Sequence, residues 1–382
     1  MKEKVAYINR QSDLEDCVKQ LQKKSAIAID LEFDKNHYQY GFTLCLMQVF
    51  DGETCYLIDP FGAVAIKTIF PVLESEAIEK LCFAFDEDMR LLFQMGVNVT
   101  GLLDLSIAHI LTGEESLSLS NTLETVLDKK AQKSQQRSNW VKRPLTDEQR
   151  YYAAEDVVHL FDLKEVLLKQ LESMDRLTWL AEEMNAFESR DWTASKFNAK
   201  VQKEKKKLTK QEWMRFIDLL EYRESLAAKM NKPTYRIWDQ SICLELAKHP
   251  ERWSETSNNK KLHPKLRTPK VIQKIKTIIE ASTADFKALN LANDAPALTP
   301  LTAEDKMLRS RNKKRLNSIK DDFVAPVKEE MKALYGAPLT NYVLSNRKVK
   351  HLVLGELELL NYQKQIISSI AEKIGLNWPK SL

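Results

Sequence analysis

The stretch that most constrains this chain is an apolar run that ends in two carboxylates. Residues 26–29 are apolar, and Asp30 and Glu32 follow, two positions apart. A run of this kind predicts a strand buried on both faces of a sheet. Side chains alternate along a strand, so Asp30 and Glu32 share one side, while Leu31 and Phe33 point toward the core on the other.

Two neighbouring carboxylates repel each other, so the fold must supply a compensating partner. Mg²⁺ and Mn²⁺ prefer carboxylate oxygens and are the usual partners. A single Asp-x-Glu pair more often marks a strand that leaves the core for a polar loop. A metal site at Asp30 and Glu32 therefore requires further carboxylates at suitable places.

The length of the chain calls for more than one hydrophobic core. At 382 residues with an apolar fraction of 43% and few Gly and Pro, it is expected to form two or three helix-rich domains. The net charge of +4 says little about partners. The five cysteines include no C-x-x-C pair, and neither a signal peptide nor a membrane-length segment is found, so we expect a cytoplasmic protein with no membrane partner.

The first 113 residues change from consecutive strands to alternating strands and helices. A helix is expected over residues 12–24, and strands at residues 42–50 and 54–59 flank Asp51-Gly52, which is a strong hairpin signal. Helices are then expected near residues 64–73 and 87–95 and up to residue 113, with a strand near 80–85 and a strand or turn that ends in residues 102–104. This order predicts an α/β fold with a mixed sheet and helices on both of its faces.

Two further helices are expected at residues 120–131 and 146–171. Tyr152 and Asp156 are four apart on the second helix and so share one face, while Glu155 is rotated away and is expected to be exposed. Taken alone, such a Tyr–Asp pair usually lies on a solvated edge.

These motifs together resemble a known family. Asp30-x-Glu32 on a strand, an aspartate after the strand at residues 80–84, and Tyr152-x-x-x-Asp156 on a helix are similar to the four-carboxylate 3′–5′ exonucleases. Another branch of that superfamily has a histidine five residues before the last aspartate, so Tyr152 indicates the tyrosine subtype. The string Trp140…Arg143-Pro144-Leu145…Gln149…Tyr152-Ala153-Ala154…Asp156-Val157 resembles ribonuclease D. The resemblance covers about residues 5–175 and implies an RNase H-like mixed-sheet exonuclease domain over residues 1–175.

The third carboxylate has more than one candidate. The family pattern places the aspartate in the helix that follows the strand and a short turn, which selects Asp88. Asp86 can serve as the helix N-cap instead. Asp104 resembles a structural aspartate of the family and is the alternative. Many relatives have a histidine where this chain has Phe83, a departure that concerns substrate positioning.

The resemblance also implies a mechanism, in which two divalent ions, Mg²⁺ or Mn²⁺, lie about 4 Å apart. Asp30 would bridge both ions, Glu32 and Asp156 would complete the shell of the ion that activates water, and Asp88 would hold the second. Tyr152 would orient the attacking water. Nucleoside 5′-monophosphates would leave one at a time from RNA 3′ ends, such as those of tRNA precursors.

The remainder of the chain is predicted to be helical. Residues 176–210 are expected to form a helical, charged linker, and residues 211–290 resemble the helicase-and-RNase-D C-terminal (HRDC) domain, where Lys232 and Arg236 could contact phosphates. After a Pro/Ala-rich linker at residues 293–300, residues 300–382 are expected to form a second helical, HRDC-like domain. Its basic run fits RNA contact and a solvated helix face equally well, and consists of Arg309, Arg311, Lys313, Lys314 and Arg315.

Two alternatives to the exoribonuclease stay open. A DNA 3′–5′ exonuclease could use the same site, because carboxylates do not choose the sugar. A non-catalytic RNA-binding protein could have kept the fold, although the presence of all four carboxylates argues against decay. We expect a monomer in each case.

Overall fold

The chain forms two compact units in a computed structural model that describes residues 4–115, 118–130, 135–193, 199–289, 295–299 and 302–379. Unit 1 comprises residues 1–32, 44–193 and 303–382, and unit 2 comprises residues 33–43 and 194–302. Residues 293, 294 and 300 of the expected linker lie outside the described residues.

Unit 1 is built on a six-stranded sheet in the order β1-β4-β3-β2-β5-β6. β3 and β4 are antiparallel and are joined through Gly52, whose φ is 91°, while β1–β4, β2–β5 and β5–β6 are parallel. The predicted mixed sheet and hairpin are therefore confirmed. The strands are β1 (Lys4–Arg10), β2 (Ala26–Lys35), β3 (Phe42–Phe50), β4 (Thr54–Ala63), β5 (Glu79–Cys82) and β6 (Leu102–Asp104).

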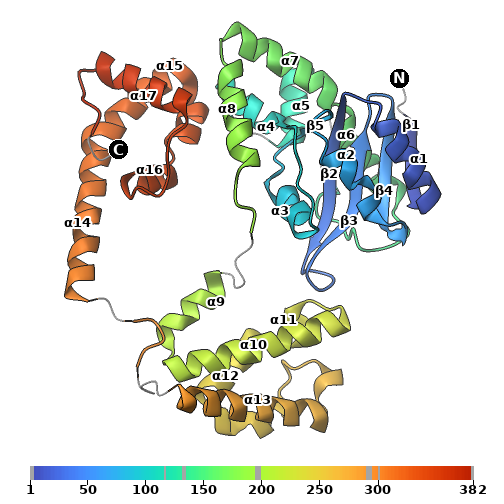
Figure 1. Cartoon of the computed structure of the whole chain (residues 1–382), viewed down its shortest axis with the longest axis vertical. Helices are drawn as coiled ribbons and strands as arrows, with labels where there is room; N and C mark the ends of the chain where they lie inside the picture. The colour runs from blue at the N-terminus through green and yellow to red at the C-terminus, as the bar shows by residue number, and fades with distance from the viewer. Residues whose placement is uncertain are drawn as a thin grey trace. The chain divides into compact units, whose positions relative to one another are not determined.

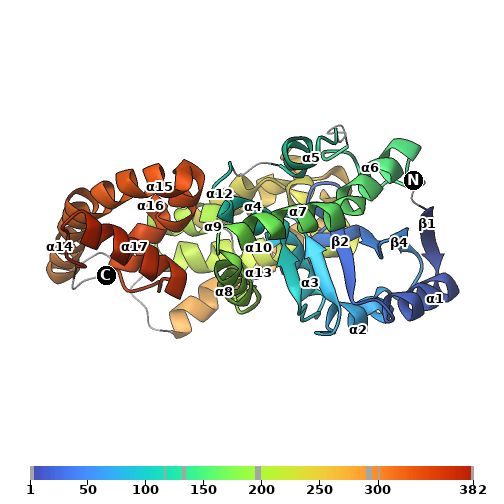
Figure 2. The same ribbon diagram turned by 90° about the horizontal axis from the view of Figure 1, so that it is seen from above.

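Helices cover both faces of this sheet (Figure 2), as expected from the sequence. α1 and α2 lie on one side, and α6 and α7 lie on the other. The helices of this part are α1 (Gln11–Leu21), α2 (Phe70–Leu73), α3 (Asp86–Gln94), α4 (Leu105–Leu111), α5 (Leu119–Leu127), α6 (Asp147–Val158), α7 (Leu160–Ser173) and α8 (Leu177–Glu188). The single helix expected over residues 146–171 is in fact two helices, α6 and α7, which are separated at His159.

The C-terminal helices of unit 1 dock on α8. They are α14 (Ala303–Ile319), α15 (Ala325–Val343), α16 (Asn346–Val353) and α17 (Asn361–Lys373). Trp179 of α8 stacks on Tyr362 of α17 with ring centroids 5.0 Å apart. Glu183 of α8 is buried and accepts hydrogen bonds from Tyr342, Tyr362 and Gln363. These contacts join residues far apart in the sequence.

Unit 2 is a helical bundle, drawn in yellow-green to orange in Figure 1. It includes α9 (Ala199–Glu204), α10 (Lys210–Met230), α11 (Thr234–Ile237), α12 (Gln240–Lys248) and α13 (Pro269–Ala288). Phe216, Trp238 and Ile275 belong to its core. Segment 33–43 belongs to this unit, because Tyr235 donates to the carbonyl of His37 at 3.0 Å and Asn36 donates to the Thr234 hydroxyl at 3.2 Å.

The helical linker expected at residues 176–210 is not one continuous helix. α8 ends at Glu188 and α9 begins at Ala199, while residues 194–198 lie outside the described part of the chain. No helix among the described residues is both long and apolar enough to cross a membrane.

Candidate active site

Strand β2 and helix α6 bring three carboxylates together on one face of the sheet. Ile27, Ala28, Ile29 and Leu31 are buried and anchor β2 in the centre of the sheet. One carboxylate oxygen each of Asp30, Glu32 and Asp156 lies within 4.8 Å of the other two. An acidic group of this size can hold a metal ion.

Burial and mutual repulsion raise the pKa values of the carboxyl groups in this cluster. Burial raises the pKa of Asp30 well above its usual range, and the charges of Asp156, Asp88 and Glu32 raise it further. Glu32 follows the same pattern, because burial and then the charges of Asp156 and Asp88 raise its pKa. Burial raises the pKa of Asp156 to about 7. Ionised carboxylates at this distance repel one another, and a bound cation would compensate their charge.

Asp88 adds a fourth carboxylate from the first turn of α3. It is buried, its pKa is raised to about 7 mainly by burial, and its charge acts on both Asp30 and Glu32. Its Oδ1 is buried without a hydrogen-bond partner among the described residues. A buried, unpartnered carboxylate oxygen costs free energy unless it binds a cation or a proton, so Asp88 also fits a metal ligand.

Asp104 has a different task, which is to fix the turn that precedes α3. Its carboxylate accepts hydrogen bonds from the backbone N–H groups of Ala84 at 2.9 Å and Phe85 at 3.0 Å, and it caps α4 through Ser106. Ala84 has a φ of 56°, a left-handed conformation that these bonds help to hold. Asp104 therefore serves the backbone around Asp88.

Asp86, expected as an N-cap, does not cap α3. The helix begins at Asp86 itself, Phe85 occupies the N-cap position, and no side chain caps it. Asp86 instead accepts a hydrogen bond from Arg190 at 2.9 Å. An acidic group in the first turn still favours the helix dipole, which explains why the sequence carries three there.

Tyr152 stands beside the carboxylates on α6. Burial raises the pKa of its phenol, and the charges of Asp156, Glu32 and Asp30 raise it further. The phenol is hydrogen-bonded to Asp156 and therefore stays protonated over the physiological range. Its ring packs against Trp140, with centroids 6.1 Å apart.

Glu155 was expected to be exposed, and this expectation is wrong. Only 17% of its side chain is exposed, and it lies 3.7 Å from His159 one turn later. The hydrogen bond with His159 lowers its pKa. The helix pattern correctly turned Glu155 away from Tyr152 and Asp156, but it could not show that Glu155 pairs with His159, one turn later at the end of α6. Phe83, where relatives carry histidine, is partly exposed just after β5.

The predicted basic residues lie outside the carboxylate group. Lys232 and Arg236 belong to unit 2, and the run from Arg309 to Arg315 is exposed on α14.

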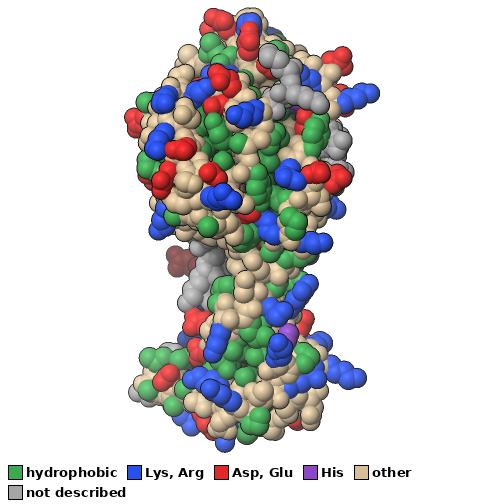
Figure 3. Space-filling model, turned by 90° about the vertical axis from the view of Figure 1, so that its right-hand side faces the viewer, with side chains coloured by type: hydrophobic (Ala, Val, Ile, Leu, Met, Phe, Trp, Pro, Cys, Tyr) green, Lys and Arg blue, Asp and Glu red, His purple; other side chains and the backbone are tan. Residues whose placement is uncertain are grey.

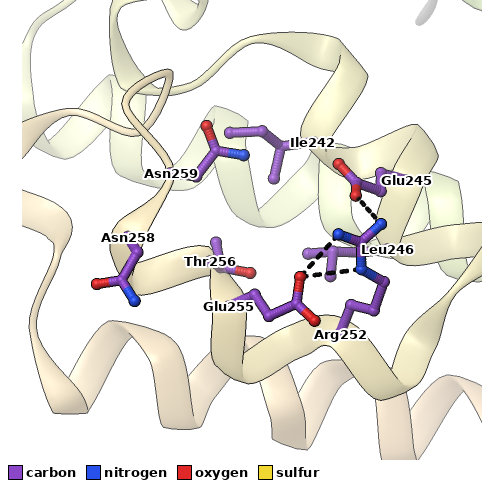
Figure 4. A pocket seen from close by; sticks show the side chains of 8 residues that line it. All are labelled: Ile242, Glu245, Leu246, Arg252, Glu255, Thr256, Asn258 and Asn259. Atoms are coloured by element: carbon purple, nitrogen blue, oxygen red, sulfur yellow. Dashed lines mark hydrogen bonds and ion pairs between the residues drawn. The ribbon is translucent and has the colours of Figure 1, made fainter.

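A hollow lies in unit 2 beside Arg252 (Figure 4). It has a volume of about 350 Å³, and Ile242, Leu246 and Thr256 contribute to its lining. The Arg252 guanidinium lies 2.6 Å from Glu245 and 2.7 Å from Glu255. Two carboxylates already neutralise this arginine, so the hollow does not offer a cationic site for phosphate.

Comparisons with known sequences show which family the part of the chain with the carboxylates resembles. Residues 5–172 match the profile of a family described as 3′–5′ exonuclease. A ribonuclease D from Shewanella sp. (strain ANA-3) is 34% identical over 179 residues, which make up 46% of this chain and 46% of that protein. A ribonuclease D from Zymomonas mobilis is 31% identical over 241 residues, or 61% of this chain and 60% of that protein. The chain thus aligns with about half of the length of these curated relatives.

Comparison with solved structures extends the similarity in fold to nearly the whole chain. Escherichia coli RNase D, described as an exoribonuclease involved in structured RNA processing, matches with a TM-score of 0.69 over 98% of this chain and 99% of that chain. At 19% sequence identity, this match shows a shared fold.

Proposed function

Since residues 5–172 match the profile of a family described as 3′–5′ exonuclease, we propose that this protein is a metal-dependent 3′–5′ exoribonuclease. It would release nucleoside 5′-monophosphates one at a time from RNA 3′ ends, with structured RNAs such as tRNA precursors as substrates. The convergence of Asp30, Glu32 and Asp156 within 4.8 Å, beside Asp88, is the observation that carries the proposal.

The carboxylates would hold two divalent ions, Mg²⁺ or Mn²⁺. Asp30 would contact both, Glu32 and Asp156 the first, and Asp88 the second. When bound, such ions activate a water molecule and offset the charge on the attacking and leaving oxygens. Tyr152 would hold the attacking water by its hydroxyl, which is close enough to Asp156 to bond with it.

Unit 2 would bind the body of the RNA. We propose residues 1–175 as the catalytic domain, 176–210 as a linker, 211–290 as an HRDC domain and 300–382 as a second, HRDC-like domain. On the face drawn in Figure 3, Lys and Arg side chains surround apolar atoms in the lower part of the picture. Lys232 and Arg236 of unit 2 and the exposed run on α14 would contact phosphates.

Several backbone contacts bring more cations to the side of α11. His263 donates its backbone N–H to the carbonyl of Ile237 at 2.8 Å, and Trp238 pairs with Leu262. Burial lowers the pKa of His263, and the charges of Lys232, Lys265 and Arg267 lower it further. The four cationic side chains Lys232, Arg236, Lys265 and Arg267 form no ion pair among the described residues. We call these four residues the α11 cluster.

The catalytic proposal is tested by digesting a 3′-labelled single-stranded RNA, and the same sequence as DNA, with Mn²⁺, Mg²⁺ or EDTA. We expect labelled mononucleotides from RNA only when a metal is present. Asp30→Asn and Asp156→Asn should each lower the rate by about 100-fold or more, the scale for loss of one charge-stabilising group.

Other outcomes separate the alternatives. Equal rates on RNA and DNA would replace the RNA substrate with nucleic acid in general. RNA binding without any cleavage would contradict catalysis and leave an RNA-binding protein. The carboxylate group is complete within one chain, so we also propose that the monomer is active.

A further inference from the structure

Arginine is well suited to binding phosphate, so Arg143 is a candidate for a contact with the RNA backbone. Its hydrogen bonds exclude that role. A guanidinium has five N–H donors. Arg143 uses five protein acceptors: both carboxylate oxygens of Asp59, at 2.7 Å each, and the carbonyls of Cys45, Trp140 and Lys142 at 2.6, 2.7 and 2.9 Å. No donor is left for an RNA phosphate.

The acceptor Asp59 is itself held from several sides. Tyr7 donates its hydroxyl to it, and the Phe61 backbone N–H donates to it at 2.9 Å. These bonds, with that from Arg143, lower the pKa of Asp59 although its burial acts in the opposite direction. Arg143 also lies over the Phe61 ring, 4.8 Å from its centroid. The Arg143–Asp59 pair thus joins the segment before α6 to strand β4.

Arg143 also donates a hydrogen bond to the carbonyl of Trp140, whose indole lies beside Tyr152. Trp140 lies in an irregular segment, so no helix or strand ladder fixes its backbone. Its side chain is 3% exposed, and its indole packs against the ring of Tyr152. Gln149 of α6 holds the same segment through the Ser138 hydroxyl at 2.8 Å.

We propose that Arg143 is a positioning residue that acts through Trp140 to hold the phenol of Tyr152 in place. The inference rests on the proposed function for its kinetic consequence, because Tyr152 would orient the attacking water. Asp156 holds the phenol at its hydroxyl, and Trp140 packs against its ring at an angle of 40°. Without Trp140 in place, the ring of Tyr152 would gain freedom and the water would lose its alignment, which costs rate without costing substrate affinity.

A double-mutant cycle tests the proposal. Arg143→Lys keeps the charge but loses the planar fork, and we expect a roughly tenfold lower single-turnover rate with unchanged Kd for RNA and for Mn²⁺. In a Tyr152→Phe background the same change should lower the rate no further. Trp140→Phe should behave as Arg143→Lys does. Arg150→Lys, an exposed arginine on α6 paired with Asp147, is the matched control and should leave all values unchanged.

Additive losses of rate in the cycle would overturn the proposal, because they would show that Arg143 acts independently of Tyr152. A weaker Kd for RNA with an altered salt dependence would also overturn it, in favour of a phosphate contact.

A measurement without RNA separates this inference from the proposed function. A fluorotyrosine placed at position 152 should give one narrow ¹⁹F resonance in the wild type and in Arg150→Lys, and a broadened or split resonance in Arg143→Lys. A narrow, unshifted line in Arg143→Lys would contradict the positioning role even if the protein is an active nuclease. The expected line shapes in a protein that cleaves no RNA would retain the positioning role and reject the catalytic proposal.

Discussion

Asp88 and Asp156 both have strongly raised pKa values, which make the stability of the fold depend on pH. Both have a pKa near 7, raised mainly by burial, whereas a solvated aspartate in the unfolded chain titrates near 4. Between about pH 4 and pH 7 the folded protein therefore holds protons that the unfolded chain has released. The state that binds more protons loses stability as pH rises, so the metal-free fold is weakened toward neutral pH.

This sign gives a prediction for the metal-free protein. In EDTA, the free energy of unfolding should fall by roughly 3 kcal/mol between pH 5 and pH 8 for each proton released, since a pKa of about 7 keeps that proton bound over about two pH units of this window and each unit corresponds to about 1.4 kcal/mol. Asp156→Asn removes one charge, so at pH 8 this variant should be more stable than the wild type. Urea unfolding at the two pH values measures both effects.

The controls separate this local effect from general titration. Glu165→Gln, on the exposed face of α7, should leave the pH dependence unchanged. Mn²⁺ at pH 8 should restore stability to the wild type more than to Asp156→Asn. A wild type that gains stability from pH 5 to pH 8 without metal would show that the carboxylates are not strained.

The resemblance to the four-carboxylate exonucleases singled out Asp30, Glu32 and Asp156, whereas periodicity predicted only that Asp30 and Glu32 share one side of a strand. The sequence could not by itself decide between Asp88 and Asp104. Both follow short strands, and their difference lies in hydrogen bonds to backbone groups that a sequence does not display. The saturation of Arg143 was also beyond its reach, since its acceptors come from segments up to 98 residues away.

At the scale of elements, the first turn of α3 depends on a neighbouring strand. Asp104 ends β6 and accepts from the two residues that lead into α3, while the backbone N–H of Asp104 lies 3.3 Å from the Met184 sulfur of α8. The position of Asp88 thus follows from the end of β6. A metal at Asp88 should be sensitive to Asp104 although Asp104 would not touch it.

We expect Asp104→Asn to weaken binding of the second Mn²⁺ and to lower stability by about 2 kcal/mol, because a buried acceptor of several N–H groups loses its charge and one acceptor position. The ratio of Mn²⁺ bound per protein, followed by electron paramagnetic resonance, reports on the metal directly. Asp162→Asn on α7 is the matched control, since it breaks a largely exposed pair with Lys129. Two full-affinity Mn²⁺ sites in Asp104→Asn would argue against this dependence.

Two elements differ from the sequence expectation for identifiable reasons. β1 (Lys4–Arg10) was not expected, because it is an edge strand with several exposed side chains and lacks a continuous apolar run. The break between α6 and α7 was missed because His159 is neither Gly nor Pro, and apolar residues continue across it. The hairpin at Gly52 and strand β2 were predicted because a turn residue and a long apolar run are strong local signals.

At the scale of the whole molecule, the last helices belong to the same compact unit as the sheet. Glu183 accepts from two phenols and one amide, and Glu182 accepts from the first backbone N–H of α17 at 2.7 Å. Burial raises the pKa of Tyr342 and Tyr362, and the charge of Glu183 adds to it, so both hydroxyls remain donors. A charged acceptor with three donors is a strong fixed contact.

Removal of this acceptor should release the C-terminal helices from α8. Glu183→Ala leaves two buried hydroxyls without an acceptor, and we expect a loss of about 3 kcal/mol in docking. Faster hydrogen exchange in α17, with α6 unchanged, is the expected result. Glu330→Ala serves as the control, because it breaks only the pair with Lys373 within the C-terminal helices. Unchanged exchange in α17 would show that apolar packing alone holds the helices.

Substrate affinity should depend on charges of unit 2 that are separate in sequence from the carboxylates. Replacing the α11 cluster of Lys232, Arg236, Lys265 and Arg267 by alanine removes four cations that form no ion pair within the described part of the chain. Each lost phosphate contact reduces the slope of log K against log salt by about 0.7 for a single strand, so the slope should fall by about 3. Mn²⁺ binding and cleavage of a dinucleotide should not change, because neither needs distant phosphates.

Arg252→Ala supplies the matched control for this binding experiment, because it removes an arginine of the same unit that Glu245 and Glu255 already neutralise (Figure 4). Its salt slope for RNA should equal that of the wild type. If the cluster variant also keeps the wild-type slope, RNA is bound elsewhere, and the exposed run on α14 becomes the surface to test. If the slope falls while dinucleotide cleavage persists, unit 2 binds the RNA and the carboxylates of unit 1 cleave it. Binding and cleavage would then be carried out by charged residues in separate parts of the chain.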